Sequence, residues 1–166
     1  MAAGDSNAMK KCYENYILID TGTNLTNKKF GRDLESVVKR ATDAGVRKMV
    51  VSGNSMKSSR EALRLAHIYP GTLYSTAGVH PHDAKSWTDD TLAELREVAT
   101  CSECVAVGEC GLDYNRDFST PDVQQEVFEL QDGFVLPCCF DYCLIVAETT
   151  LQVIRKIKMR LLKVNP

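Results

Sequence analysis

The chain has 166 residues, of which 44% are hydrophobic and 25% are charged, as in ordinary globular domains. This length predicts a single domain with a sizeable core. The formal net charge is −2, which excludes nucleic-acid binding driven by the overall electrostatic field. Any such role needs a local site.

The first 15 residues are predicted to form a polar leader, because they carry several charges and lack the apolar core of a signal peptide. Seven cysteines, an odd number, lie mostly within apolar runs, which indicates free thiols in a reducing compartment. The longest apolar-rich run, Phe134–Ala147, contains Pro137 and Asp141 and is too short to span a bilayer. We therefore expect an intracellular protein of the cytoplasm or nucleus, with no membrane span.

Strand, loop and helix patterns alternate four times between residues 16 and 130. The predicted strands are Tyr16–Asp20, Lys48–Val51, Leu73–Ala77 and Val105–Val107. The first is almost continuously apolar, which favours a strand covered on both faces. The predicted helices are Leu34–Ala44, about Ser58–Tyr69, and one capped by Thr88 with Asp89 and Asp90 in its first turn. A fourth begins at Pro121 and continues through Val123, Val127 and Leu130. This alternation favours a parallel sheet, in either a doubly wound fold or a β/α barrel.

Polar residues gather after each predicted strand. They are Asp20 and Asn24, then Ser52 and Asn54, then His80, His82 and Asp83, and finally Glu109 and Asp113. In a parallel sheet these positions lie at one end, where barrels and open α/β sheets hold their active sites. Carboxylates, an asparagine and histidines together suit a divalent cation such as Mg²⁺, Mn²⁺ or Zn²⁺.

Two of these features have more than one interpretation. Glu109 follows a short apolar strand and a glycine, so it is either a site residue or a structural carboxylate that caps the next helix or pairs with a lysine. His80 and His82 flank a proline. They form a metal-binding pair, or one of them donates a hydrogen bond to a substrate phosphate, or they belong to an ordinary turn.

Three stretches resemble the TatD family of metal-dependent deoxyribonucleases in order and spacing. They are Asp20–Thr26 (DTGTNLT), Ser75–Asp83 (STAGVHPHD) and Val107–Asn115 (VGECGLDYN). The resemblance implies a TIM-type (β/α)₈ barrel that binds one or two divalent ions and hydrolyses DNA phosphodiester bonds. It implies that Glu109 is a catalytic metal ligand, and Asp20 is expected to assist it. It also places His80 near the substrate phosphate, and we expect His82, Asn24 and Asp113 to bind substrate with it.

The resemblance ends near residue 128. The family's remaining ligands are expected to be later histidines and an aspartate, yet the chain has three histidines and none lies beyond His82. We therefore predict an α/β fold, an incomplete (β/α)₈ TIM barrel with the first four to five β/α units, over residues 16–130. Residues 131–166 are predicted to be a divergent tail with a strand-like run, Phe134–Ala147, and a basic helix, Leu151–Leu162.

The expected function is that of a metal-dependent deoxyribonuclease that is weak or inactive as this truncated chain. The alternative is a non-catalytic assembly or regulatory fragment that self-associates or pairs with a full-length homologue. An unclosed barrel favours this alternative, because it exposes sheet edges and an apolar face. A related hydrolase with a substrate other than nucleic acid also fits the near-neutral charge.

Overall fold

The computed structural model describes residues 17–116, 118–135 and 143–148. They contain a parallel sheet of five strands in the order β1-β2-β3-β4-β5. The strands are β1 (Leu18–Thr23), β2 (Val46–Val51), β3 (Leu73–Ala77), β4 (Cys104–Leu112) and β5 (Cys143–Glu148). Each strand pairs with the next one in sequence, as in a β/α barrel, and the prediction of an incomplete barrel is confirmed.

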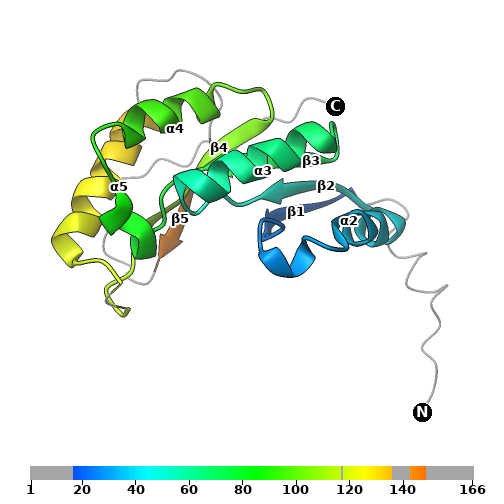
Figure 1. The fold of residues 1–166 in the computed structure, drawn as a ribbon, viewed down its shortest axis with the longest axis horizontal. Coiled ribbons are helices and arrows are strands. Elements are labelled where there is room, and N and C mark those ends of the chain that lie inside the picture. The colour runs from blue at the N-terminus through cyan, green and yellow to red at the C-terminus, as the bar shows by residue number, and fades with distance from the viewer. Residues whose placement is uncertain (1–16, 117, 136–142, 149–166) are drawn as a thin grey trace, which may run out of the picture.

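Helices connect the strands and cover one face of the sheet, as Figure 1 shows for α3, α4 and α5. The helices are α2 (Leu34–Asp43), α3 (Met56–Ile68), α4 (Thr91–Ala99) and α5 (Pro121–Val135), with short 3₁₀ turns η1 (Lys28–Phe30) and η2 (Pro81–Ser86). Among the described residues, no helix has the length and apolarity needed to cross a membrane.

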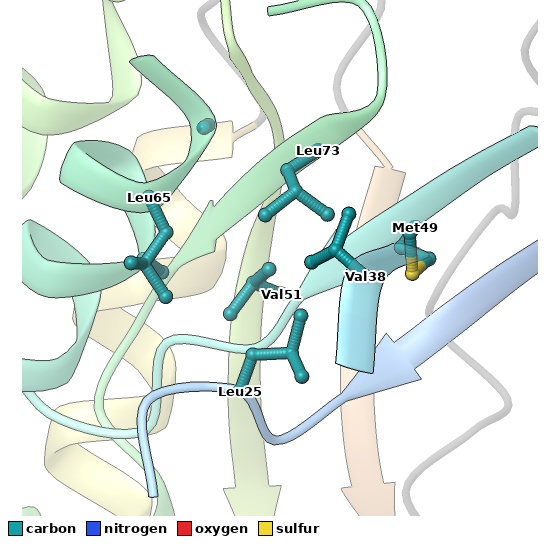
Figure 2. Close-up of a cluster of buried hydrophobic side chains, with 8 residues drawn as sticks. Leu25, Val38, Met49, Val51, Leu65 and Leu73 are labelled. Carbon is teal, nitrogen blue, oxygen red and sulfur yellow. The ribbon is translucent and has the colours of Figure 1, made fainter. Parts of the chain in front are cut away.

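The core lies between the sheet and these helices. Val51 of β2 and Leu73 of β3 are fully buried, and they pack in one cluster with Val38 of α2 and Leu65 of α3 (Figure 2). Burying such a side chain fully contributes about 1.5–3 kcal/mol. A second cluster joins β3 and β4 to α4. The helices are therefore fixed to one face of the sheet by apolar contacts.

The strand β1 differs from the prediction that it is covered on both faces. Ile17, just before β1, is 74% exposed, and Ile19 within it is 44% exposed. The reason is that β1 is the edge strand of the described sheet and hydrogen-bonds only to β2 there. Apolar side chains in a strand favour burial. Whether they are buried depends on the other segments of the protein that pack against the strand.

The strand β4 is much longer than the predicted Val105–Val107. It runs through the stretch that was predicted to be a loop, so that Glu109 lies within the strand. Pairing explains the difference, because β5 continues alongside it and pairs with Cys110, Gly111 and Leu112. Pairing with β5 therefore continues the strand past Gly111, where the sequence alone favours a turn.

The start of α4 also differs from the prediction. The helix begins at Thr91 with Asp90 as its N-cap residue, so Thr88 is not the cap and Asp89 is not in the first turn. The Thr88 hydroxyl instead lies 3.0 Å from the Thr91 hydroxyl, and the Thr91 hydroxyl accepts a hydrogen bond from the Thr88 N–H. Local hydrogen bonding by threonine thus competes with helix initiation.

The C-terminal part of the described chain lies partly in the predicted tail. The boundary predicted at residue 130 falls inside α5. The strand-like run predicted over Phe134–Ala147 begins within α5, and β5 overlaps its end and extends one residue beyond it. Residues 1–15, predicted to be a leader, and the predicted basic helix Leu151–Leu162 lie outside the described residues. The division of the chain into leader, half barrel and tail stays a prediction.

Glycine backbones bring the carboxyl end of β3 into direct contact with the middle of β4. A side chain at Gly78, which follows β3, would place its β-carbon 2.6 Å from the carbonyl carbon of Gly108 and 2.7 Å from its α-carbon. These are main-chain atoms of β4 and cannot move aside as a flexible side chain does. Only glycine at position 78 allows the two strands to lie this close.

We expect the substitution Gly78→Ala to destabilise the fold by about 2 kcal/mol or more, because overpacking against backbone has to be relieved by separating the strands. The control is Gly133→Ala in α5, where a β-carbon would meet nothing within 4 Å and helix propensity favours alanine. Urea unfolding midpoints measure both. Equal stability of Gly78→Ala and the unmodified chain would contradict the close contact.

Candidate functional site

Four polar side chains meet at the carboxyl ends of β3 and β4. His80 and His82 belong to the turn that follows β3, Glu109 lies in β4, and Asp113 follows β4 directly. The two histidine rings are 4.3 Å apart, and His82 Nε2 lies 2.6 Å from Asp113 Oδ2. We call these four residues the strand-end cluster.

Asp113 holds the ring of His82 in one orientation. Its Oδ1 accepts hydrogen bonds from the main-chain N–H groups of Asn115 and Arg116. The hydrogen bond from His82, and then these main-chain bonds, lower the pKa of Asp113 below its ordinary value. An ionised Asp113 requires the hydrogen on Nε2 of His82, so this nitrogen is committed to the carboxylate and is not free for a ligand.

His80 presents a hydrogen-bond donor. Its Nδ1 accepts the N–H of His82 at 3.1 Å. Burial, and next the charge of His82, lower the pKa of His80, while Glu109 and Asp113 oppose that decrease. The ring is therefore neutral at neutral pH, and because Nδ1 is an acceptor the proton sits on Nε2. A neutral Nε2–H group suits a phosphate oxygen better than a metal ion.

The loop after β2 fixes the main chain on both sides of this cluster. The carbonyl oxygen of Gly53 accepts the N–H of Glu109 at 2.8 Å, and that of Asn54 accepts the N–H of His80 at 2.9 Å. The peptide bond between Gly108 and Glu109 is cis. The Glu109 side chain is half-buried, and among the described residues no hydrogen bond or ion pair is seen at its carboxylate.

Asp20 and Asn24 do not join the strand-end cluster. They lie in and just after β1, which β2 and β3 separate from β4. Asp20 Oδ1 accepts the N–H of Gly22, and Asn24 Oδ1 accepts the hydroxyl of Thr26. Both residues are exposed. Their predicted roles as metal ligand and substrate contact stay predictions.

The described residues do not by themselves form a metal centre. Two oxygen groups near the cluster are free of described partners, namely the Glu109 carboxylate and the buried Oδ1 of Asn54, and oxygen ligands of this kind suit Mg²⁺ or Mn²⁺. However, no group of three His, Cys, Asp or Glu residues within the described ranges could hold an ion. Further ligands would be needed.

Two buried glutamines of α5 hold the main chain of the site, and they were not among the predicted site residues. Gln124 Oε1 accepts the N–H of Asp113, and its Nε2 donates to the carbonyl oxygens of Asp113 and Ser119. Gln131 Oε1 accepts the N–H of Val79, and its Nε2 donates to the carbonyl oxygen of Val79. One helix therefore fixes the segments that carry His80 and Asp113.

The pattern of α5 explains why these residues were missed. The sequence predicts a helix that continues through Val123, Val127 and Leu130, and it does not single out the glutamines. In the structure Leu130 is exposed, while Gln124 and Gln131 are 1% and 0% exposed. The two glutamines are seven residues apart and therefore lie on one helical face with Val127. The sequence signal for such a residue is an amide side chain on an otherwise apolar helix face. A buried amide needs hydrogen-bond partners, and main-chain groups supply them here.

The fold is that of an incomplete β/α barrel, a class of protein that holds its functional residues at the carboxyl ends of the strands. The sequence comparison then identifies the family. Residues 19–132 match the family of TatD related DNases, and the chain belongs to this family. The resemblance seen in the three motifs is confirmed.

Individual relatives agree with this assignment. The protein named 3'-5' ssDNA/RNA exonuclease TatD from Musicola paradisiaca is 46% identical over 114 residues, which are 69% of this chain and 43% of the relative. The one from a Pantoea species is 47% identical over the same length and is covered to 44%. The chain thus spans less than half the length of these curated relatives.

Solved structures show the same fold. The TatD homologue YJJV from Escherichia coli K12 matches with a TM-score of 0.68 and 30% identity, over 78% of this chain and 49% of the homologue. A TatD family hydrolase from Entamoeba histolytica matches with a TM-score of 0.70 and 24% identity, over 77% and 49% of the two chains, which supports the fold alone.

The buried amide of Gln124 supplies a stability test. We expect Gln124→Leu to cost about 3 kcal/mol, because it leaves three main-chain groups without their partner. The matched control is Gln125→Leu, since Gln125 is exposed and bonds the Tyr114 hydroxyl. Its expected effect is within about 0.5 kcal/mol. Denaturant unfolding measures both, and similar midpoints for the two variants would contradict the role of Gln124.

Proposed function

We propose that this chain supplies part of a site that hydrolyses phosphodiester bonds in nucleic acid. The observation that carries the proposal is the neutral His80 beside the available carboxylate of Glu109 at the carboxyl ends of neighbouring strands. Membership of the TatD related DNase family supports it. So do the relatives whose name describes an exonuclease of single-stranded DNA and RNA.

Each residue of the strand-end cluster has a different part in this proposal. His80 donates its Nε2–H to a non-bridging phosphate oxygen and stabilises charge that develops there. His82 and Asp113 act through His80, because the main-chain N–H of His82 holds Nδ1 of His80 and Asp113 fixes the His82 ring. The carboxylate of Glu109 would repel an anion bound on its own. It would bind a cation, or accept a proton from a water molecule that attacks the phosphate.

Metal dependence, and DNA as the natural substrate, are part of the proposal through the family resemblance. Glu109 is the candidate ligand in the strand-end cluster, and Asp20 is a second candidate on β1. Mg²⁺, Mn²⁺ or Zn²⁺ would each be compatible with the expected one or two ions. Because the described residues do not complete a metal centre, the remaining ligands would have to come from elsewhere. An intracellular location also stays a prediction.

A second candidate function is that of a non-catalytic partner of a full-length homologue, or of another copy of the chain. The observation that favours it is the exposed apolar surface of the edge strand β1 at Ile17 and Ile19. An exposed strand edge with apolar side chains can pair with another sheet.

Hydrolysis of a labelled single-stranded oligonucleotide with added Mg²⁺ or Mn²⁺ tests the proposal. We expect a weak rate that disappears in Glu109→Gln and falls about 100-fold in His80→Gln, as when a charge-stabilising donor is removed. Glu97→Gln is the control, because Glu97 is an exposed residue of α4. A rate that survives Glu109→Gln would contradict the proposal.

A rate no higher than that of Glu109→Gln would instead favour the non-catalytic partner. That alternative is tested by capture of a purified full-length TatD homologue on the immobilised chain. Capture should be lost when Ile19 is replaced by Lys, because a charge on the exposed face of β1 opposes apolar contact. Absence of capture by the unmodified chain would contradict it.

A further inference from the structure

Three aromatic rings form a row that leads from the strand-end cluster to solvent. The ring of His80 contacts that of His82 at 4.3 Å between centroids, and the ring of His82 contacts that of Phe118 at 4.7 Å. His80 is half-buried, whereas Phe118 is 54% exposed. The row therefore ends in an aromatic face that is open to a ligand next to the proposed phosphate position.

The main chain beside Phe118 is held firmly although its ring is exposed. The buried Ser119 accepts the N–H of Lys85 and donates to the carbonyl oxygen of His82 through its hydroxyl. Its carbonyl oxygen accepts a hydrogen bond from Gln124. The ring of Phe118 is thus exposed although the main chain at Ser119 is held in place. An exposed ring does not contribute the free energy of folding that a buried apolar side chain contributes.

The same loop carries a positive charge. The Arg116 side chain is 63% exposed, and its guanidinium lies 3.9 Å from Asp113. Exposed arginine beside an exposed aromatic ring is the combination by which proteins bind single-stranded nucleic acid, with bases stacked on rings and phosphates near cations. A peptide without a phosphate group would not use the proposed donor of His80 at the other end of the row.

We propose that Phe118 is the stacking platform for an unpaired nucleobase of the substrate, adjacent to the phosphate that His80 contacts. This inference rests on the proposed function and specifies its substrate class as single-stranded nucleic acid. A stacked base has to leave its neighbours, which a splayed single strand permits and a duplex resists. Arg116 then lies on the path of the sugar-phosphate backbone.

Binding of two probes by the full chain tests this inference. One probe is a labelled oligothymidylate, and the other is an abasic deoxyribose-phosphate oligomer of the same length and charge. We expect the unmodified chain to bind oligothymidylate more tightly. Phe118→Leu should weaken that binding about 5- to 150-fold, the range expected for loss of one base–aromatic stack. It should leave binding of the abasic oligomer unchanged.

Two further variants separate stacking from a structural role. Phe118→Tyr keeps the ring and should bind as the unmodified chain does. Tyr114→Leu removes another exposed ring from the same loop, one whose hydroxyl is bonded to Gln125, and should have no effect. The inference is overturned if Phe118→Leu weakens binding of both probes equally or weakens neither, or if Tyr114→Leu has the same effect.

The same measurements distinguish the two proposals. If the unmodified chain binds both probes with equal affinity, the stacking platform is wrong while phosphate binding at His80 stands. If it binds neither probe, the proposed function fails and the stacking platform fails with it.

Discussion

The contact between two glycine backbones, one at the carboxyl end of β3 and one in the middle of β4, is the constraint on which the rest of the site depends. Gly78 lies against Gly108 so closely that no side chain fits between them. The residues that follow each glycine, His80 and Glu109, are therefore brought together by main-chain packing. Their main-chain N–H groups then bond to adjacent carbonyl oxygens of the loop after β2. The geometry of the site is thus a property of the sheet.

Helices hold this arrangement from outside the sheet. The hydroxyl of Ser59 in α3 both accepts the N–H of Gly78 and donates to its carbonyl oxygen, and Gln124 and Gln131 of α5 bond the main chain at Asp113 and Val79. Buried polar groups of this kind specify one arrangement because each alternative leaves a donor or acceptor unpaired. The strand-end cluster is consequently preformed, with Asp113 holding the His82 ring and the main-chain N–H of His82 bonded to His80.

Much of this could be predicted from periodicity and spacing. Strand β3 and helix α2 agree closely with the prediction, and the polar residues after β3 and β4 do meet. What could not be predicted depends on segments distant in sequence. The length of β4 depends on its pairing with β5. Ile19 is exposed because β1 has no second neighbouring strand among the described residues. Gln131 is buried because it bonds main-chain groups some fifty residues away.

The protonation of the His80 ring tests the central claim most directly, because a preformed phosphate donor requires the proton on Nε2. Long-range nitrogen–proton correlation spectra of the imidazole side chains, recorded on the unmodified chain at neutral pH, report which nitrogen carries it. The account predicts a neutral His80 with its proton on Nε2, and a His82 that is protonated at Nε2. A His80 ring protonated on Nδ1, or on both nitrogens, would contradict it.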